Sequence, residues 1–140
     1  MTKEEKLDAL NQMNINTLME TLGIHFTDVT DDYLEATMPV DSRVHQPYGI
    51  LHGGASIALA ETVGSVLSAV SVDMTKFKSV GMQMTANHIK PVREGVVTAR
   101  AEFIRKGRTS NLVKIEIKDD EDRLICYCLL TNSIVAVDYV

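Results

Sequence analysis

The chain has 140 residues, of which 45% are hydrophobic and 24% charged, with three Pro, two Cys and no Trp. This is the composition of one ordinary globular domain over residues 1–140, long enough to bury a core without disulfides or metal. The first ten residues mix acids with bases and hold no apolar run, so we expect no secretory signal and a cytoplasmic location.

Charge is distributed unevenly along the chain. Residues 76–118 hold ten bases and three acids, a local net charge of +7, whereas the remaining residues carry −12. A basic segment on an acidic chain favours a small phosphorylated ligand, and the acidic remainder argues against nucleic acid as a partner. The alternative is that these bases only cover the solvated outer faces of strands.

The periodicity of apolar residues predicts the order of the elements. Three- and four-residue steps over residues 3–22 predict an amphipathic helix that Gly23 ends, and the pattern changes at Ile24, where a first strand is expected. Alternation predicts further strands at residues 33–39, 79–89, 96–104, 112–118 and 123–137. The turns that join the last four are short, so we expect consecutive strands to pair as antiparallel neighbours.

The segment between the second and third strands predicts one long helix over residues 53–70. This helix is apolar on all sides except at Glu61, which is the only charged residue between Arg43 and Asp73. Its serines and central carboxylate make it a poor membrane-spanning helix, so we expect that the protein does not associate with a membrane. We predict instead that the sheet wraps around the helix. The predicted fold class is α+β, with a curved antiparallel sheet around one long central helix.

Glu61 is the first candidate catalytic residue. An ionised carboxylate costs several kcal/mol to bury unless it is paired, so its place on an apolar helix needs a reason. It can lie at the helix surface or pair with a base on a strand, or it can serve as general base or nucleophile in a partly dry cleft. Ser65 follows one helical turn later on the same face, where its hydroxyl can orient Glu61 or a water.

The start of the same helix carries the second signal. Gly53 and Gly54 leave N–H groups uncovered at the positive end of the helix dipole, which favours an oxyanion site, and Gln46 and His52 can add side-chain donors. Ordinary loop geometry is the alternative for each. Gly54 and Glu61 are seven residues apart, about 10 Å along a helix. If both act on one substrate they must come from different chains, which predicts a homodimer with sites at its seam.

Other chemistries have little support in the sequence. The segment at residues 54–58 lacks the second glycine of a serine-hydrolase elbow, and the four histidines are scattered. Neither a phosphate-binding glycine motif nor a metal-ligand cluster occurs, so we expect no metal and no cofactor. Cys126 and Cys128 are spaced to share one face of a strand, which indicates two buried structural thiols rather than a redox pair.

Five motifs together resemble one known family, and they lie at residues 36–43, 46–56, 60–65, 87–91 and 107–110. They closely resemble the hotdog-fold acyl-CoA thioesterases of the 4-hydroxybenzoyl-CoA type that carry a helix glutamate, and the likeness covers nearly the whole chain. Within that family the chain is most similar to the 1,4-dihydroxy-2-naphthoyl-CoA hydrolases of menaquinone biosynthesis and to related aryl or medium-chain acyl thioesterases.

The resemblance implies hydrolysis of an acyl-CoA thioester by a homodimer, assembled further into a homotetramer. Glu61 would be the nucleophile or the base that activates water, assisted by Ser65, while the Gly53 or Gly54 amide polarises the thioester carbonyl beside Gln46 and His52. Candidates for binding the CoA moiety are Asn87, His88, Lys90, Arg93, Arg105, Lys106, Arg108 and Ser110. Alternation along the strand would point only one of Asn87 and His88 inward. The alternatives are a hotdog dehydratase or hydratase and a non-catalytic acyl-CoA-binding protein.

Overall fold

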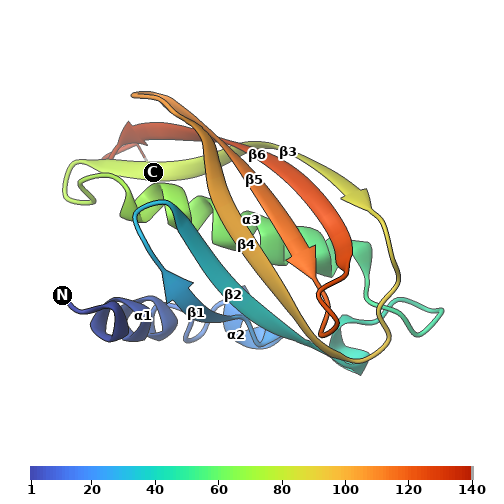
Figure 1. Ribbon diagram of the computed structural model, residues 1–140. Coiled ribbons are helices and arrows are strands. Elements are labelled where there is room, and N and C mark those ends of the chain that lie inside the picture. Colours follow the sequence, from blue (N-terminus) through green and yellow to red (C-terminus); the bar gives the residue numbers. More distant parts are fainter. Residues whose placement is uncertain (140) are drawn as a thin grey trace.

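The computed structural model describes residues 1–139 and contains one six-stranded antiparallel sheet curved around a long helix (Figure 1). The strand order is β1-β2-β4-β5-β6-β3. The predicted α+β architecture is confirmed, and the long helix has the predicted bounds. The elements are α1 (Lys3–Gln12), α2 (Leu18–Leu22), β1 (His25–Val29), β2 (Tyr33–Val40), α3 (Gly53–Val70), β3 (Phe77–His88), β4 (Gly95–Lys106), β5 (Ser110–Lys118) and β6 (Leu124–Ala136).

The N-terminal segment forms two helices, so the prediction of a single helix over residues 3–22 was wrong. Asparagine side chains bind backbone at and just before β1 at the point where the helix stops: Nδ2 of Asn11 donates to the carbonyl of Phe26, and Nδ2 of Asn14 donates to that of Ile24. Such side chains compete with helical hydrogen bonding and favour a break. Gly23 ends α2 in the left-handed conformation with φ 74°, as predicted.

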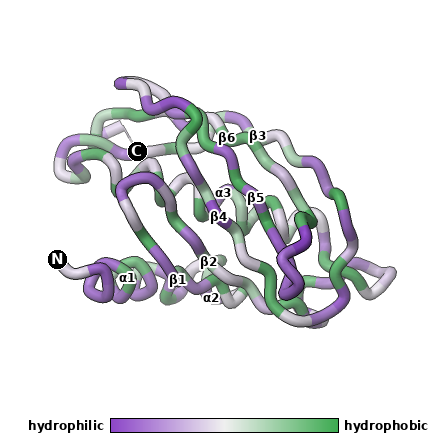
Figure 2. Tube along the Cα trace, in the orientation of Figure 1, coloured by the Kyte–Doolittle hydropathy of each residue, from purple (hydrophilic) through white to green (hydrophobic). Residues whose placement is uncertain are grey.

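The alternating strands bury one face, as their period of two requires. In β2 and β5 every second side chain is buried, and Figure 2 shows hydrophobic and hydrophilic positions following one another along the strands. α3 lies in the hollow of the curved sheet (Figure 1) and contacts its strands. This packing forms the core and fixes the helix relative to all five strands from β2 to β6.

One strand pairing differs from the prediction. The β4–β5 and β5–β6 neighbours are confirmed, but β3 pairs with β6 instead of β4. After His88 the chain leaves the ladder: Ile89 donates to the carbonyl of Ile125, Pro91 has no N–H to continue the ladder, and the carbonyl of Val92 accepts from Leu51. The link to β4 therefore crosses the end of the sheet, and β3 becomes an edge strand with one unpaired side.

α3 buries only one face within the chain, although its sequence is apolar on nearly all sides. The face toward the sheet is formed by Ser56, Leu59, Ala60, Val63, Gly64, Leu67 and Ser68. Glu61 lies outside this buried face and is exposed. Within residues 1–139, α3 is the one helix long and apolar enough to cross a membrane, and here it packs as the core helix of the sheet.

Candidate active site

A pocket of about 320 Å³ opens at the start of α3. Three segments meet there: the loop before α3, the first turn of α3, and the end of β3 with the residues that follow it. The pocket is lined by Gln46, Ile50, Leu51, Gly53, Ser56, His88, Ile89, Lys90, Pro91 and Ile125. The fold thus brings together four of the predicted site residues that are far apart in the sequence, namely Gln46, Gly53, His88 and Lys90.

The two glycine amides at the helix start are not equivalent. Nδ1 of His52, the N-cap residue, accepts a hydrogen bond of 2.8 Å from the Gly54 N–H. The Gly53 N–H has no hydrogen-bond partner within residues 1–139. Gly53 therefore supplies the amide that is available to a carbonyl oxygen, whereas His52 caps the helix and uses its Nδ1 as an acceptor.

Gln46 is held by its own loop in an orientation that leaves its amide group available. Its Oε1 accepts from the N–H of Tyr48, so its NH₂ group is the part left to donate. The loop is closed by a hydrogen bond of 2.9 Å from the Gln46 N–H to the carbonyl of Ile50. Arg93 secures the same loop, because its carbonyl binds Nε2 of His45 at 2.8 Å and its guanidinium approaches the carbonyl of Tyr48.

The end of β3 directs one of its two polar residues toward the helix. His88 packs so closely on the first turn of α3 that a Cβ at Gly53 would lie 2.9 Å from Nε2 of the imidazole. Asn87 is exposed, alternates with His88 along the strand and does not line the pocket. His88 is exposed as well, but of the two residues only His88 lines the pocket and contacts the first turn of α3.

Glu61 is remote from the pocket of its own chain. It lies eight residues after Gly53, about 12 Å along the helix, and its carboxylate instead faces β3, where a Cβ on Gly81 would meet Oε1 at 3.4 Å. Gly81 adjoins an irregularity in the ladder of this edge strand. Ser65 is oriented away from the carboxylate, since its Oγ is 3.5 Å from Oδ1 of Asn132 on β6. Within one chain, then, the carboxylate and the amide donor are in separate places.

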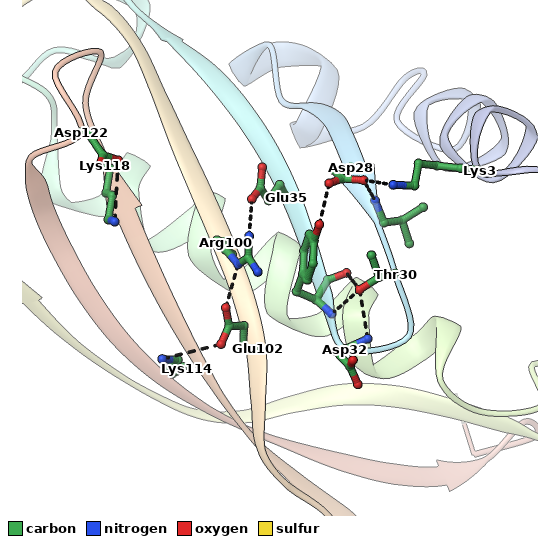
Figure 3. A network of polar contacts seen from close by, with 12 residues as sticks. Lys3, Asp28, Thr30, Asp32, Glu35, Arg100, Glu102, Lys114, Lys118 and Asp122 are labelled. Atoms are coloured by element: carbon green, nitrogen blue, oxygen red, sulfur yellow. Dashed lines mark hydrogen bonds and ion pairs between the residues drawn. The ribbon is translucent and has the colours of Figure 1, made fainter.

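The basic residues divide into paired and unpaired groups. On the outer face of the sheet, Arg100 binds Glu35 at 2.9 Å and Glu102 at 2.7 Å, and this network extends to Lys114 (Figure 3). For these bases the simpler interpretation, a solvated strand face, is correct. Among the predicted CoA-binding residues, the exposed bases that form no ion pair within residues 1–139 are Lys90, Arg93, Arg105, Lys106 and Arg108.

The unpaired bases lie at two ends of the molecule. Lys90 and Arg93 adjoin the pocket, but the hairpin at residues 105–110, which includes Ser110, follows at the far end of β4. Gly95 and Lys106 are eleven positions apart on one strand, a span of about 36 Å. In this hairpin the Lys106 ammonium lies 5.2 Å from the centroid of the Phe103 ring. The predicted CoA-binding residues therefore do not form one cluster within a single chain.

A buried polar network that the sequence analysis missed connects this hairpin with α3. Nδ2 of Asn111 donates to Oγ of Ser68 at 3.2 Å, and its Oδ1 accepts from the Gly107 N–H at 3.1 Å. Nδ2 of Asn132 donates to the same Ser68 oxygen at 2.8 Å and to the carbonyl of Gly64 at 3.2 Å. Both asparagines occupy positions where strand alternation expects an apolar side chain, which is the signal that could have revealed them.

The two cysteines are free and buried on one face of β6, as predicted. Their Sγ atoms are 3.6 Å apart, and Sγ of Cys126 lies 3.6 Å from Nδ1 of His88. Within residues 1–139 no three His, Cys, Asp or Glu side chains are grouped so that they could hold a metal ion.

Comparison with known proteins shows the family of the chain. The family model described as Thioesterase superfamily matches residues 48–126. The chain belongs to the thioesterase superfamily. A curated relative, the 1,4-dihydroxy-2-naphthoyl-CoA hydrolase of Escherichia coli, is 43% identical over 129 residues, which cover 92% of this chain and 94% of that protein.

Solved structures show the same fold. The thioesterase PA1618 of Pseudomonas aeruginosa superposes with a TM-score of 0.91 at 42% identity, covering 93% of this chain and 94% of that one. Protein SAV0944 of Staphylococcus aureus, solved with a glutamate replaced by alanine, gives 0.84 at 43% identity and covers 85% and 98%. The predicted hotdog fold is confirmed, and the chain is a thioesterase, an enzyme that hydrolyses thioesters.

Proposed function

We propose that this thioesterase hydrolyses an acyl-CoA, with an aryl group such as 1,4-dihydroxy-2-naphthoyl as the preferred acyl group and medium-chain acyl groups as further substrates. The observation that carries the proposal is the convergence of Gln46, His88 and the unpartnered Gly53 N–H on one pocket. Donors arranged in this way stabilise the negative charge that develops on a thioester oxygen during attack. The similarity to the Escherichia coli hydrolase supports the choice of acyl group.

Glu61 is the proposed nucleophile or general base. Variants of the Staphylococcus aureus protein were solved with a glutamine and a glutamate replaced by alanine, and those two residues are fifteen positions apart in that protein. Gln46 and Glu61 are fifteen positions apart in this chain. The equal spacing supports the pairing of these two residues in one reaction.

The site is proposed to form between two chains that pair along β3. β3 is an edge strand with exposed apolar side chains, since Met82 is 66% and Phe77 is 43% exposed. Edge strands of this kind are normally covered by another strand. A two-fold axis makes the β3 strands of the two chains antiparallel. The end of β3 that carries His88 in one chain then lies near the first half of β3, which contains Gly81, in the other chain. Because Glu61 faces Gly81, it then approaches the partner's pocket.

The same pairing gives the basic hairpin a role. The carbonyl of Thr109 accepts from Ile134, and Ile134 pairs with Ser79, so the hairpin lies at the end of the sheet where β3 begins. This is the end toward which the partner's pocket would lie. Arg105, Lys106 and Arg108 are therefore proposed to bind the phosphates of a CoA whose thioester occupies the partner's pocket.

Release of free thiol from acyl-CoA tests the proposed function. The purified chain is expected to release CoA from aryl and medium-chain acyl-CoA, with the highest kcat/KM for a fused aromatic acyl group. A dehydratase or hydratase would change the acyl chain without releasing thiol, and a binding protein would show no turnover. A panel that includes benzoyl-, naphthoyl-, octanoyl- and palmitoyl-CoA separates these outcomes and ranks the acyl groups.

The basic hairpin yields a separate prediction. The triple charge reversal Arg105→Glu, Lys106→Glu and Arg108→Glu is expected to raise KM for an acyl-CoA about tenfold or more, because several phosphate contacts become repulsive. Hydrolysis of the N-acetylcysteamine thioester of the same acid, which lacks the nucleotide, should not change. Lys6→Glu, on the exposed face of α1, is the control for a charge reversal away from the hairpin and should leave KM unchanged. Equal losses with both substrates would remove the hairpin from CoA binding.

A further inference from the structure

His88 is held from its inner side by a buried thiol. The β3–β6 register sets His88 opposite Cys126 and Ala86 opposite Cys128, so only one of the two cysteines adjoins the imidazole. Sγ of Cys126 lies 3.6 Å from Nδ1 of His88 and 3.6 Å from Sγ of Cys128. The two cysteines are 1% and 0% exposed, so their thiol protons depend on protein acceptors.

The direction of this hydrogen-bond chain follows from its acceptors. When Cys128 donates to Sγ of Cys126 and Cys126 donates to Nδ1 of His88, both thiol protons are satisfied and the stronger acceptor, nitrogen, is used. The reverse direction makes Nδ1 donate to sulfur and leaves the Cys128 proton without an acceptor among residues 1–139. Their mutual hydrogen bond raises the pKa of the Cys128 thiol, with burial adding to it, and lowers the pKa of the Cys126 thiol, as expected when Cys128 is the donor.

The other nitrogen of the ring faces the pocket. A neutral imidazole that accepts at Nδ1 carries its proton on Nε2. Nε2 is the ring atom closest to the first turn of α3, 2.9 Å from the position of a Cβ on Gly53, and both residues line the pocket. A protonated Nε2 adds a donor beside the Gly53 N–H, whereas an unprotonated one would present a lone pair to the same substrate oxygen.

We propose that Cys126 is a positioning residue of the active site, because its thiol fixes the ring and the tautomer of His88 so that Nε2–H faces the thioester carbonyl beside Gly53. The expected effect on catalysis rests on the proposed function. The expected tautomer of His88 does not depend on that function, and it can be measured in the protein without substrate.

The neighbouring cysteine supplies a matched control. Cys126→Val is expected to lower kcat by about tenfold or more and to leave KM unchanged. The loss should be smaller than the roughly 10²- to 10³-fold decrease in kcat that follows removal of a complete oxyanion-hole donor. Cys128→Val removes an equally buried thiol from the same strand face and should stay within about twofold of wild type. In a His88→Ala background, adding Cys126→Val should have no further effect, since the group it positions is gone.

Nitrogen NMR of the full chain labelled with ¹⁵N-histidine supplies the second readout. His88 is expected in the Nε2–H tautomer in the wild type and in Cys128→Val, and as a mixture of tautomers in Cys126→Val, or in Cys126→Ala where the valine variant does not fold. An Nδ1–H tautomer in the wild type overturns the proposal, and so does an equal kinetic loss in both valine variants. Absence of acyl-CoA hydrolysis by the wild type would overturn the proposed function and leave the tautomer result standing.

Discussion

Replacing Glu61 by glutamine is expected to lower kcat by about 10²- to 10⁴-fold. The amide keeps the shape of the side chain but cannot take a proton from water or attack a carbonyl carbon, so either of the two proposed roles is lost. Glu61 is exposed in the chain, and the fold does not depend on its charge. The urea midpoint of Glu61→Gln should therefore equal that of the wild type, and KM should change little.

Two further variants complete this experiment. Glu61→Asp keeps the carboxylate but on a shorter side chain. It should retain more activity than Glu61→Gln, because the reacting group is preserved, and less than the wild type, because the carboxylate reaches less far. Glu4→Gln, which neutralises an exposed helix carboxylate on α1, should have wild-type kinetics. A normal turnover number for Glu61→Gln would show that this carboxylate takes no part in the reaction, whatever the geometry around it.

The sequence was sufficient for most elements because burial of one strand face enforces a period of two. The helix at residues 53–70 was equally clear, since Gly53 begins its apolar run and few charges interrupt it. The position of β3 was not predictable in the same way. A short link that contains Pro91 and Gly95 has the composition of a hairpin turn, and only the tertiary structure shows that it crosses from one edge of the sheet to the strand beside β2.

Site residues were predictable where the backbone alone determines their chemistry. Gly53 is such a case, because an uncovered N–H at a helix start is a local property. The use of the Gly54 amide by His52, and the contacts of Ser65 and Asn111 with side chains far along the chain, depend on rotamers and strand register. The same holds for the exposure of Glu61, which reflects a helix face that the chain itself leaves uncovered.

Mixed dimers test whether each site is built from two chains. When Glu61→Ala chains and Gly53→Pro chains are co-expressed in equal amounts, random pairing makes half of the dimers mixed, and each mixed dimer regains one intact site of two. The mixture should then show about one quarter of wild-type activity although each parent is inactive. Proline fits the backbone at the first position of a helix, where it removes the N–H of Gly53, and its Cβ also displaces the His88 ring, so the pocket of that chain loses both groups. Gln46→Ala can replace it as the pocket variant if that chain does not fold.

The reciprocal mixture decides between shared and self-contained sites. Here a chain that carries both Glu61→Ala and Gly53→Pro is co-expressed in equal amounts with the wild type. If each site is built from two chains, both sites of every mixed dimer are inactive, and only the wild-type dimers, about one quarter of all dimers, remain active. If each chain held a complete site, one site per mixed dimer would survive and about one half would remain. The first mixture would in that case stay inactive, and Glu61 would have to reach the Gly53 amide across the two helical turns that separate them in one chain.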